Sequence, residues 1–141
     1  MNGVKELGYF GITASDLPAW EHFALEVLGL ARGEAADGAL ALRLDDRVHR
    51  MIVEPGASDD MQFIGYDCGS DATLEAIAGR LREAGHRVEA CDETLARRRA
   101  VRRLHATRDP AGNRVELYVD LARADMPFES ALVPSGFCTA S

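Results

Sequence analysis

The pattern of apolar and polar positions predicts a strand, a helix and two further short strands in the first part of the chain. The opening strand carries β-forming side chains and glycines, and the helix has apolar residues at helical spacing after a cap at Ser15 or Asp16. Gly29 can end this helix, and two aspartates supply a turn between the short strands. The predicted elements cover residues 4–13, 17–28, 39–44 and 48–54.

The same order begins again after the second short strand. A strand leads into another amphipathic helix that Asp71 can cap and Gly85 can end, and one offset of 56 residues superimposes the ends of the two helices. Two units too small to bury their own sheet faces should pair. We therefore predict an α+β domain of two paired βαβββ modules, about 1–56 and 57–120, with mixed sheets that enclose a cleft. The remaining predicted elements are strands at 61–66, 87–90, 104–107 and 114–119, and an extended tail or linker over 121–141.

The last predicted strand places one carboxylate, Glu116, at the middle of its polar face. The segment from Arg108 to Asp120, RDPAGNRVELYVD, opens with turn residues and then alternates apolar with polar positions. A carboxylate on the polar face of a central strand is a candidate metal ligand. Aligning the IVE and YVD ends of the two repeats puts Arg50 opposite Glu116, whereas an alternative match of RVH with RVE puts His49 there.

Composition and charge narrow the class of protein. The 141 residues are 47% hydrophobic and 28% charged, which fits one globular domain, and no apolar run has membrane-spanning length. The formal net charge of −7 opposes binding to nucleic acid or to an anionic membrane. The N-terminus shows no secretion-signal pattern, so we expect a cytoplasmic protein. Cys68, Cys91 and Cys138 are expected to be reduced thiols.

Several ordered motifs resemble those of a known family. The duplicated organisation, closed by DPAGNRVELY, is similar to the vicinal oxygen chelate superfamily of glyoxalases and bleomycin-resistance proteins. The stretches LGYFGITASDLPAWEHFALEVLGL, MQFIGYDC, ETLARRRAV and MPFESALVPSGF resemble the N-terminal domain of type I extradiol dioxygenases of the 2,3-dihydroxybiphenyl 1,2-dioxygenase kind. The resemblance covers nearly the whole chain, and SGFCTAS looks like the linker into a second domain.

The resemblance implies where the metal of such an enzyme lies. In that family Fe(II) is held only in the C-terminal domain, by two histidines and one glutamate, and we expect that domain to be absent here. The positions that correspond to metal ligands look like Tyr9, Arg50 or His49, Gly65 and Glu116. Neither Tyr9 nor Gly65 replaces a histidine, and Arg50 cannot lose its proton to become a ligand. We therefore expect neither a metal site nor a catalytic residue in this chain.

The charged residues lead to two hypotheses about the cleft. In the first, Arg50 balances Glu116 where a metal ion would otherwise do so, because a buried carboxylate needs a charge partner. In the second, Glu116 faces solvent. His22 and His86 are expected at the surface. His105 can face the cleft, but a lone histidine is more often a packed or hydrogen-bonded structural residue. A run of arginines is interpreted mainly as a solvated loop and strand edge, with a partner surface as the alternative; its members are Arg97, Arg98, Arg99, Arg102 and Arg103.

Together these features favour a structural role over catalysis. We expect the non-metal-binding N-terminal domain of an extradiol catechol dioxygenase, inactive alone, with a structural and oligomerisation role beside an iron-bearing C-terminal domain. The apolar, proline-containing tail should pack on its own domain or on a neighbour, so the predicted partners are the missing domain or a second copy of the chain. The alternative is a stand-alone small-molecule binding protein of the same superfamily, with a small aromatic or anionic ligand in the cleft.

Overall fold

The computed structural model describes residues 3–35 and 37–139, which form two units. The first unit comprises Tyr9–Gln62 and Ala122–Ser141, and the second comprises Met1–Gly8 and Phe63–Leu121. The order of strand, helix and three strands occurs twice along the chain, with one additional helix in the second copy. The predicted α+β fold with a duplicated βαβββ order is confirmed.

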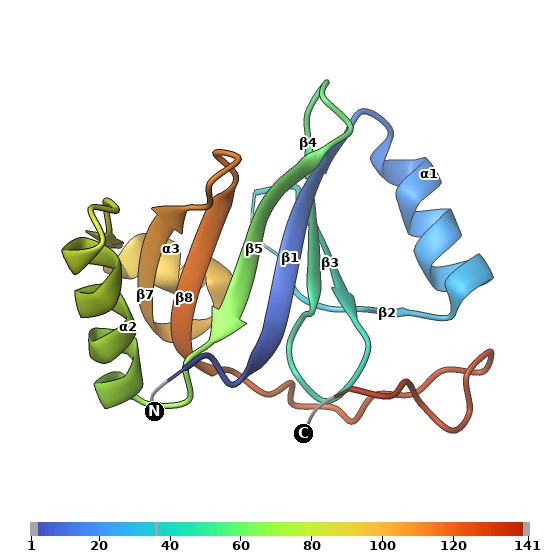
Figure 1. Cartoon of the computed structure of the whole chain (residues 1–141). Coiled ribbons are helices and arrows are strands. Elements are labelled where there is room, and N and C mark those ends of the chain that lie inside the picture. The colour runs from blue at the N-terminus through green and yellow to red at the C-terminus, as the bar shows by residue number, and fades with distance from the viewer. Residues whose placement is uncertain (1–2, 36, 140–141) are drawn as a thin grey trace. The chain divides into compact units, whose positions relative to one another are not determined.

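The first unit packs a helix on one face of its strands (Figure 1). β1 (Glu6–Ala14) runs parallel to β4 (Met51–Pro55), which pairs antiparallel with β3 (Leu40–Arg43), and β3 pairs antiparallel with β2 (Ala31–Arg32). The side chains of alternate strand residues form the core beneath the helix, because successive residues point to opposite faces. The buried core residues are Ala14, Ala24, Leu40, Leu42, Met51 and Val53.

The helix of the first unit begins and ends close to the predicted positions. α1 (Leu17–His22) continues directly into a π-helical segment, η1 (Phe23–Leu28). The Asp16 side chain caps α1 by accepting a hydrogen bond from the Ala19 backbone N–H at 3.0 Å. Gly29 ends η1 with φ of 80°, a left-handed conformation that glycine adopts without a steric cost. The π-helical turn was not predicted.

The second unit repeats the strand pairing of the first. β5 (Met61–Asp67) runs parallel to β8 (Arg114–Leu121). β8 pairs antiparallel with β7 (Val101–Arg108), which pairs antiparallel with β6 (Glu89–Ala90). β7 is longer than the predicted strand at 104–107, and its extension begins inside the arginine-rich run.

The second helix covers one face of these strands. α2 (Asp71–Glu83) begins after Ser70, whose hydroxyl accepts a hydrogen bond from the Thr73 backbone N–H at 3.2 Å. The predicted cap at Asp71 is therefore wrong by one residue, and Asp71 is instead the acidic first residue that the helix dipole favours. Buried residues of α2 and β8 form the core between them, and they are Leu74, Ile77, Leu117 and Val119.

A third helix corrects the interpretation of the arginine-rich run as a loop. α3 (Glu93–Arg99) is capped by Asp92, whose carboxylate accepts from the Leu95 backbone N–H at 2.9 Å. Ala100 ends the helix in the left-handed conformation, with φ of 57°, and β7 follows at once. Figure 1 shows α3 and α2 on opposite sides of β7 and β8. The run of arginines therefore belongs to a helix and a strand.

The tail packs on the first unit without forming a helix. The Arg43 Nη2 donates to the Met126 carbonyl at 2.7 Å, and the Phe128 backbone N–H donates to the Asp46 carboxylate at 2.9 Å. An isolated β-bridge joins Arg47 to Arg123. The described part of the tail has no regular helix, and it contacts its own unit.

Two expectations from composition concern thiols and membranes. Cys68, Cys91 and Cys138 are free cysteines, as expected, with Cys68 buried and Cys138 exposed. In the described part of the chain, no helix combines the length and apolar character needed to cross a membrane. The cytoplasmic location stays a prediction.

Candidate functional site

The buried centre of the second unit is the carboxylate of Glu116. This side chain has an exposed fraction of 0%. Arg99 donates from Nε to Oε1 at 2.8 Å and from Nη2 to Oε2 at 3.2 Å. Arg114 donates from Nε to Oε2 at 2.9 Å. The solvent-facing alternative for Glu116 is therefore wrong, because both oxygens are enclosed and bonded to guanidinium groups.

Local structure explains why these groups meet. Arg114 precedes Glu116 by two residues in β8, so both side chains project from the same face of the sheet. Arg99 lies in the last turn of α3, which covers that face. Its guanidinium Cζ lies 3.7 Å from the ring centroid of Phe63, a cation–π contact. Phe63 is in turn the strand neighbour of Arg114, so the ring and both cations surround one carboxylate.

The electrostatics of this cluster favour the ionised carboxylate. Burial lowers the pKa of Arg114, but the hydrogen bond to Glu116 and the negative charge of Glu116 outweigh it, so the pKa lies above its usual value. Arg114 also donates from Nη2 to the Cys91 sulfur at 3.9 Å. Two cations thus hold one fully buried anion, and a lone carboxylate would be costly at this position.

The residues around Glu116 do not fit the iron that this fold family implies. A facial triad needs two imidazoles and one carboxylate with open positions. Gly65 is the strand neighbour of Glu116 and brings no side chain, and both carboxylate oxygens accept hydrogen bonds from arginines. Among residues 3–35 and 37–139, no three His, Cys, Asp or Glu side chains are grouped so that they could hold a metal ion.

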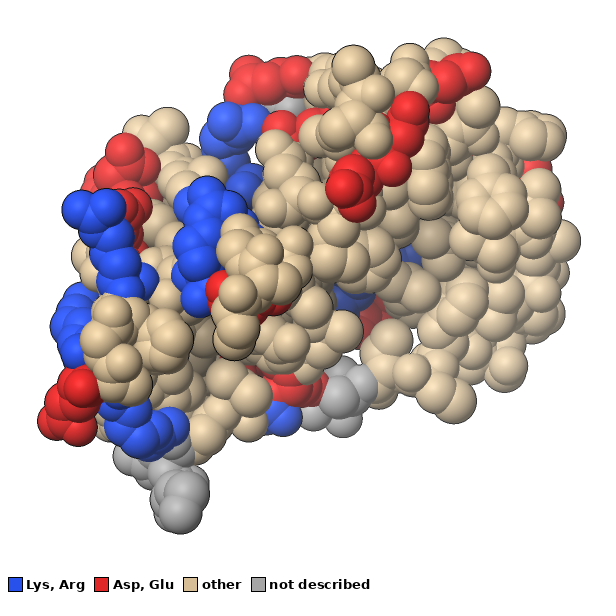
Figure 2. Space-filling model, turned by 45° about the horizontal axis from the view of Figure 1, so that its top comes forward, with Lys and Arg blue, Asp and Glu red and all other residues tan. Residues whose placement is uncertain are grey.

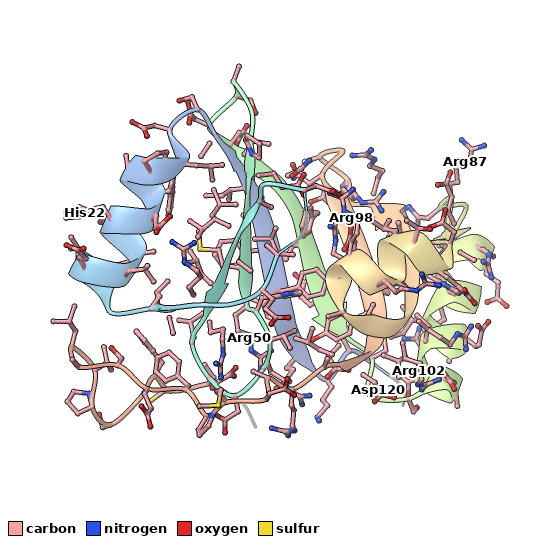
Figure 3. All side chains as sticks on the ribbon, turned by 180° about the vertical axis from the view of Figure 1, so that it is seen from behind. His22, Arg50, Arg87, Arg98, Arg102 and Asp120 are labelled. Carbon is pink, nitrogen blue, oxygen red and sulfur yellow. The ribbon has the colours of Figure 1, made fainter. Side chains whose placement is uncertain are left out.

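His105 faces the opposite side of the sheet from Glu116, as a packed residue and not as a residue of the cleft. It pairs with Leu117 across β7 and β8, so it projects toward α2. It is buried, and its Nε2 lies 3.7 Å from the Glu75 carboxylate on α2. His22 is exposed, as predicted, and Figure 3 shows it on the outside of the first helix. His86 is also exposed.

In the first unit, Tyr9 and Arg50 occupy positions related to Gly65 and Glu116. The register of Phe10 with Met51 in β1 and β4, extended by one residue, places Tyr9 beside Arg50. The register of β5 and β8 places Gly65 beside Glu116 in the same way. Both Tyr9 and Arg50 are buried. The position of the carboxylate in one unit is thus taken by a guanidinium in the other.

Arg50 has its own carboxylate partner. Its Nε and Nη2 donate to Asp45 Oδ2 at 3.0 and 2.8 Å. Burial raises the pKa of Asp45, but the hydrogen bonds from Arg50 and from the Arg47 backbone N–H outweigh it and hold the pKa below its usual value. His49, the alternative candidate, is buried with its ring edge-to-face on Tyr9, 5.9 Å between centroids. The hypothesis that Arg50 pairs directly with Glu116 concerns residues of different units, and it stays a prediction.

The remaining arginines of the run form ion pairs at the surface of the second unit. Arg102 donates to Asp120 at 2.8 Å and to Asp71 at 3.0 Å, and Figure 3 shows Arg102 beside Asp120. Arg103 pairs with Asp71 and Glu75. These pairs connect β7 with α2, so the run joins elements of its own unit in addition to presenting charge to solvent.

Sequence reasoning did not find Arg99, Arg114 or Asp45 as partners of the buried charges. A signal for Arg114 was available, because its spacing of two from Glu116 puts both on one strand face. A signal for Arg99 lay in the capping residue Asp92, seven residues before it, which is two helical turns. Asp45 was interpreted only as a turn residue.

Comparison with known proteins places the chain in a class. Residues 7–56 match the family described as dihydroxybiphenyl dioxygenase BphC D1. The chain is 39% identical over 138 residues to a biphenyl-2,3-diol 1,2-dioxygenase of Pseudomonas sp. strain KKS102, covering 96% of this chain and 47% of that protein. It thus spans about half the length of this curated relative.

Solved structures give the same result. A catechol 2,3-dioxygenase crystal structure superimposes with a TM-score of 0.88 at 30% identity, over 92% of this chain and 44% of that one. A halotolerant catechol dioxygenase superimposes with a TM-score of 0.92 at 26% identity, over 99% and 47%. The fold is that of the vicinal oxygen chelate class. More narrowly, the predicted resemblance to the N-terminal domain of a BphC-like extradiol dioxygenase is confirmed.

Proposed function

We propose that this chain is the domain of an extradiol catechol dioxygenase that does not bind the iron, and that its role is structural. The observation that carries the proposal is the closed cluster of Glu116 with Arg99 and Arg114. Similarity to biphenyl-2,3-diol 1,2-dioxygenase over 96% of the chain supports the assignment to such an enzyme. Fe(II) and the ring cleavage of an aromatic vicinal diol then belong to the other half of the protein.

The charge cluster supports this role in a specific way. A metal ion bound at Glu116 would compete with two guanidinium groups that are already hydrogen-bonded to both carboxylate oxygens. Displacing them would separate the buried guanidinium of Arg99 from its carboxylate, which is strongly unfavourable. The second unit therefore keeps a rigid, filled centre where a metal-binding relative would keep an open one.

Iron content tests the proposal directly. The chain is incubated anaerobically with Fe(II), desalted and analysed for iron, beside the variant Glu116→Gln. We expect less than about 0.1 iron per chain in both proteins, because neither offers a facial triad. Stoichiometric iron in the natural sequence that is lost in Glu116→Gln, together with cleavage of 2,3-dihydroxybiphenyl, would overturn the proposal.

The same samples distinguish the two candidate functions, a stand-alone binding protein and a structural domain. Calorimetric titration with 2,3-dihydroxybiphenyl should give no saturable heat if the chain is only a supporting domain. Saturable binding without turnover would favour the small-molecule binding alternative. A reading frame that continues beyond Ser141 into a second copy of the fold, with two histidines and a glutamate, would independently support the dioxygenase.

We also propose that the tail side of the first unit takes part in self-association. Met126 and Leu132 on the tail are 71% and 56% exposed, and Phe23 and Val27 of η1 are 44% and 58% exposed. Large apolar side chains exposed together favour contact with another protein surface. Sedimentation velocity should show a dimer or larger species that Leu132→Asp weakens. A monomer at high concentration would contradict self-association.

A further inference from the structure

Three arginines of the second unit gather beside β7 and β8. Arg108 and Arg114 are direct cross-strand neighbours in β7 and β8. Arg87 lies two residues before β6, whose Glu89 pairs with Ala106 of β7. The Thr107 hydroxyl donates to the Arg87 carbonyl at 2.8 Å and holds this segment against β7. All three side chains line one cavity of this unit.

These arginines line a partly open cavity beside β7 and β8. Its volume is about 270 Å³, which suits a small ligand. Figure 2 shows blue side chains gathered over the part of the molecule that holds this unit, and Figure 3 shows Arg87 at its outer edge. The lining residues are Arg87, Glu89, Ala106, Thr107, Arg108 and Arg114.

The cavity has more positive charge than its own residues balance. Like charges directly opposite each other on a sheet are destabilising. Three guanidinium groups and one carboxylate, Glu89, line the cavity. Glu116, which lies behind Arg114, is offset by the charge of Arg99, so an excess of two positive charges remains. Hydrogen bonds hold two of the three guanidinium groups in place. Arg114 donates to Glu116, and Arg108 donates from Nη1 to the Gly112 carbonyl at 3.2 Å. The donors are thus organised before any ligand arrives.

We infer that this cavity binds a small dianion of the phosphate or sulfate type. Planar guanidinium groups bind such oxyanions through paired, charge-assisted hydrogen bonds. A dianion would neutralise the excess of two positive charges among the lining residues and remove the repulsion among the arginines. Glu89 at the rim favours a compact anion that stays close to the arginines. The site adjoins the Glu116 cluster and shares Arg114 with it, but the inference does not depend on the proposed function.

Titration with inorganic phosphate tests the inference. Binding is measured by calorimetry at constant ionic strength, with chloride replacing phosphate, for the natural sequence, Arg108→Gln and the control Arg82→Gln. Arg82 is an exposed arginine of α2 outside the cavity. We expect saturable binding in the millimolar range, weakened about tenfold or more in Arg108→Gln and unchanged in Arg82→Gln. Equal weakening in the two variants, or no saturation, would overturn the inference.

Thermal unfolding supplies a second readout that a merely structural arginine would not give. Without phosphate, Arg108→Gln should unfold at a slightly higher temperature than the natural sequence, because one like charge leaves the cavity. With phosphate, the natural sequence should gain stability by mass action and the variant should gain less. If phosphate stabilises both proteins equally, the anion acts elsewhere and the assignment fails.

Discussion

The two units carry opposite charges at related positions of their sheets. The parallel pairing of β1 with β4 places Arg50 in the first unit, and the corresponding pairing of β5 with β8 places Glu116 in the second unit. Arg50 takes its partner, Asp45, from the turn before β4, whereas Glu116 takes its cations from α3 and from its own strand. Each duplicated unit thus neutralises its buried charge with residues of the same unit.

The units differ in how completely the charges are enclosed. The side chains of the pair in the first unit are 8% and 18% exposed, whereas Glu116 is 0% exposed. Water can therefore relieve part of the loss when the Asp45 partnership is broken, but it cannot reach Glu116 without rearrangement. This difference predicts unequal consequences for equivalent substitutions in the two units.

The largest effect is expected for Glu116→Gln in the second unit. The substitution keeps the shape of the side chain but removes the negative charge that Arg99 and Arg114 share. Removing one member of a buried ion pair costs about 3–5 kcal/mol. The free energy of unfolding should fall by this amount in urea denaturation followed by circular dichroism.

A matched double variant shows whether the loss of unfolding free energy comes from a buried charge that has lost its partner. Arg99→Met combined with Glu116→Leu removes both buried partners and leaves Arg114, whose side chain is 26% exposed and can turn toward water. Apolar replacement of a whole buried pair is often close to neutral, so the double variant should be more stable than Glu116→Gln. A single variant within about 0.5 kcal/mol of the natural sequence would contradict the closed cluster.

A smaller effect is expected for Asp45→Asn in the first unit. The variant loses the charge that accepts two hydrogen bonds from Arg50, and such bonds to charged groups contribute about 1.5–3 kcal/mol. Because the Arg50–Asp45 pair is partly exposed, the measured loss of unfolding free energy should lie near the lower end of this range. Asp46→Asn is the control, because Asp46 is exposed and its amide variant can still accept from Phe128. A loss in Asp45→Asn as large as in Glu116→Gln would remove the distinction between the units.

The sequence predicted the repeat more completely than the charge partners. The alternation of apolar and polar residues predicted the strand β8, and Gly29 predicted the end of the first helix. Both signals are local in the sequence. The partner of Glu116 depended on α3, a helix of seven residues with three arginines and no long apolar stripe. Such a helix is held by tertiary contacts, here the Arg99 ion pair, and periodicity alone could not reveal it.

Acid should reveal the contribution of Asp45 at a still smaller scale. Because the folded pKa of Asp45 lies below its usual value of 3.8, its ion pair contributes fully above that value and is lost as the pH falls through the folded pKa. The difference in unfolding free energy between the natural sequence and Asp45→Asn should be constant from about pH 8 to 5 and shrink below about pH 4. Other acidic groups titrate in both proteins, so their contributions cancel in the difference between the two unfolding free energies. A difference that grows on acidification would contradict the assignment.

The smallest effect is expected two residues before Arg99 in the same helix. Arg97 pairs with Glu93 at 3.3 Å, but their side chains are 78% and 92% exposed. Exposed pairs at this helical spacing contribute about 0.3–0.5 kcal/mol at most and weaken in salt. Arg97→Gln should therefore lower the free energy of unfolding by no more than this, and by less in 0.5 M salt. Arg99→Gln, which removes one of the two cations from Glu116, should cost several times more in the same assay. Equal losses at the two positions would mean that α3 is stabilised by its helical charge pattern alone and that burial of Arg99 against Glu116 contributes nothing.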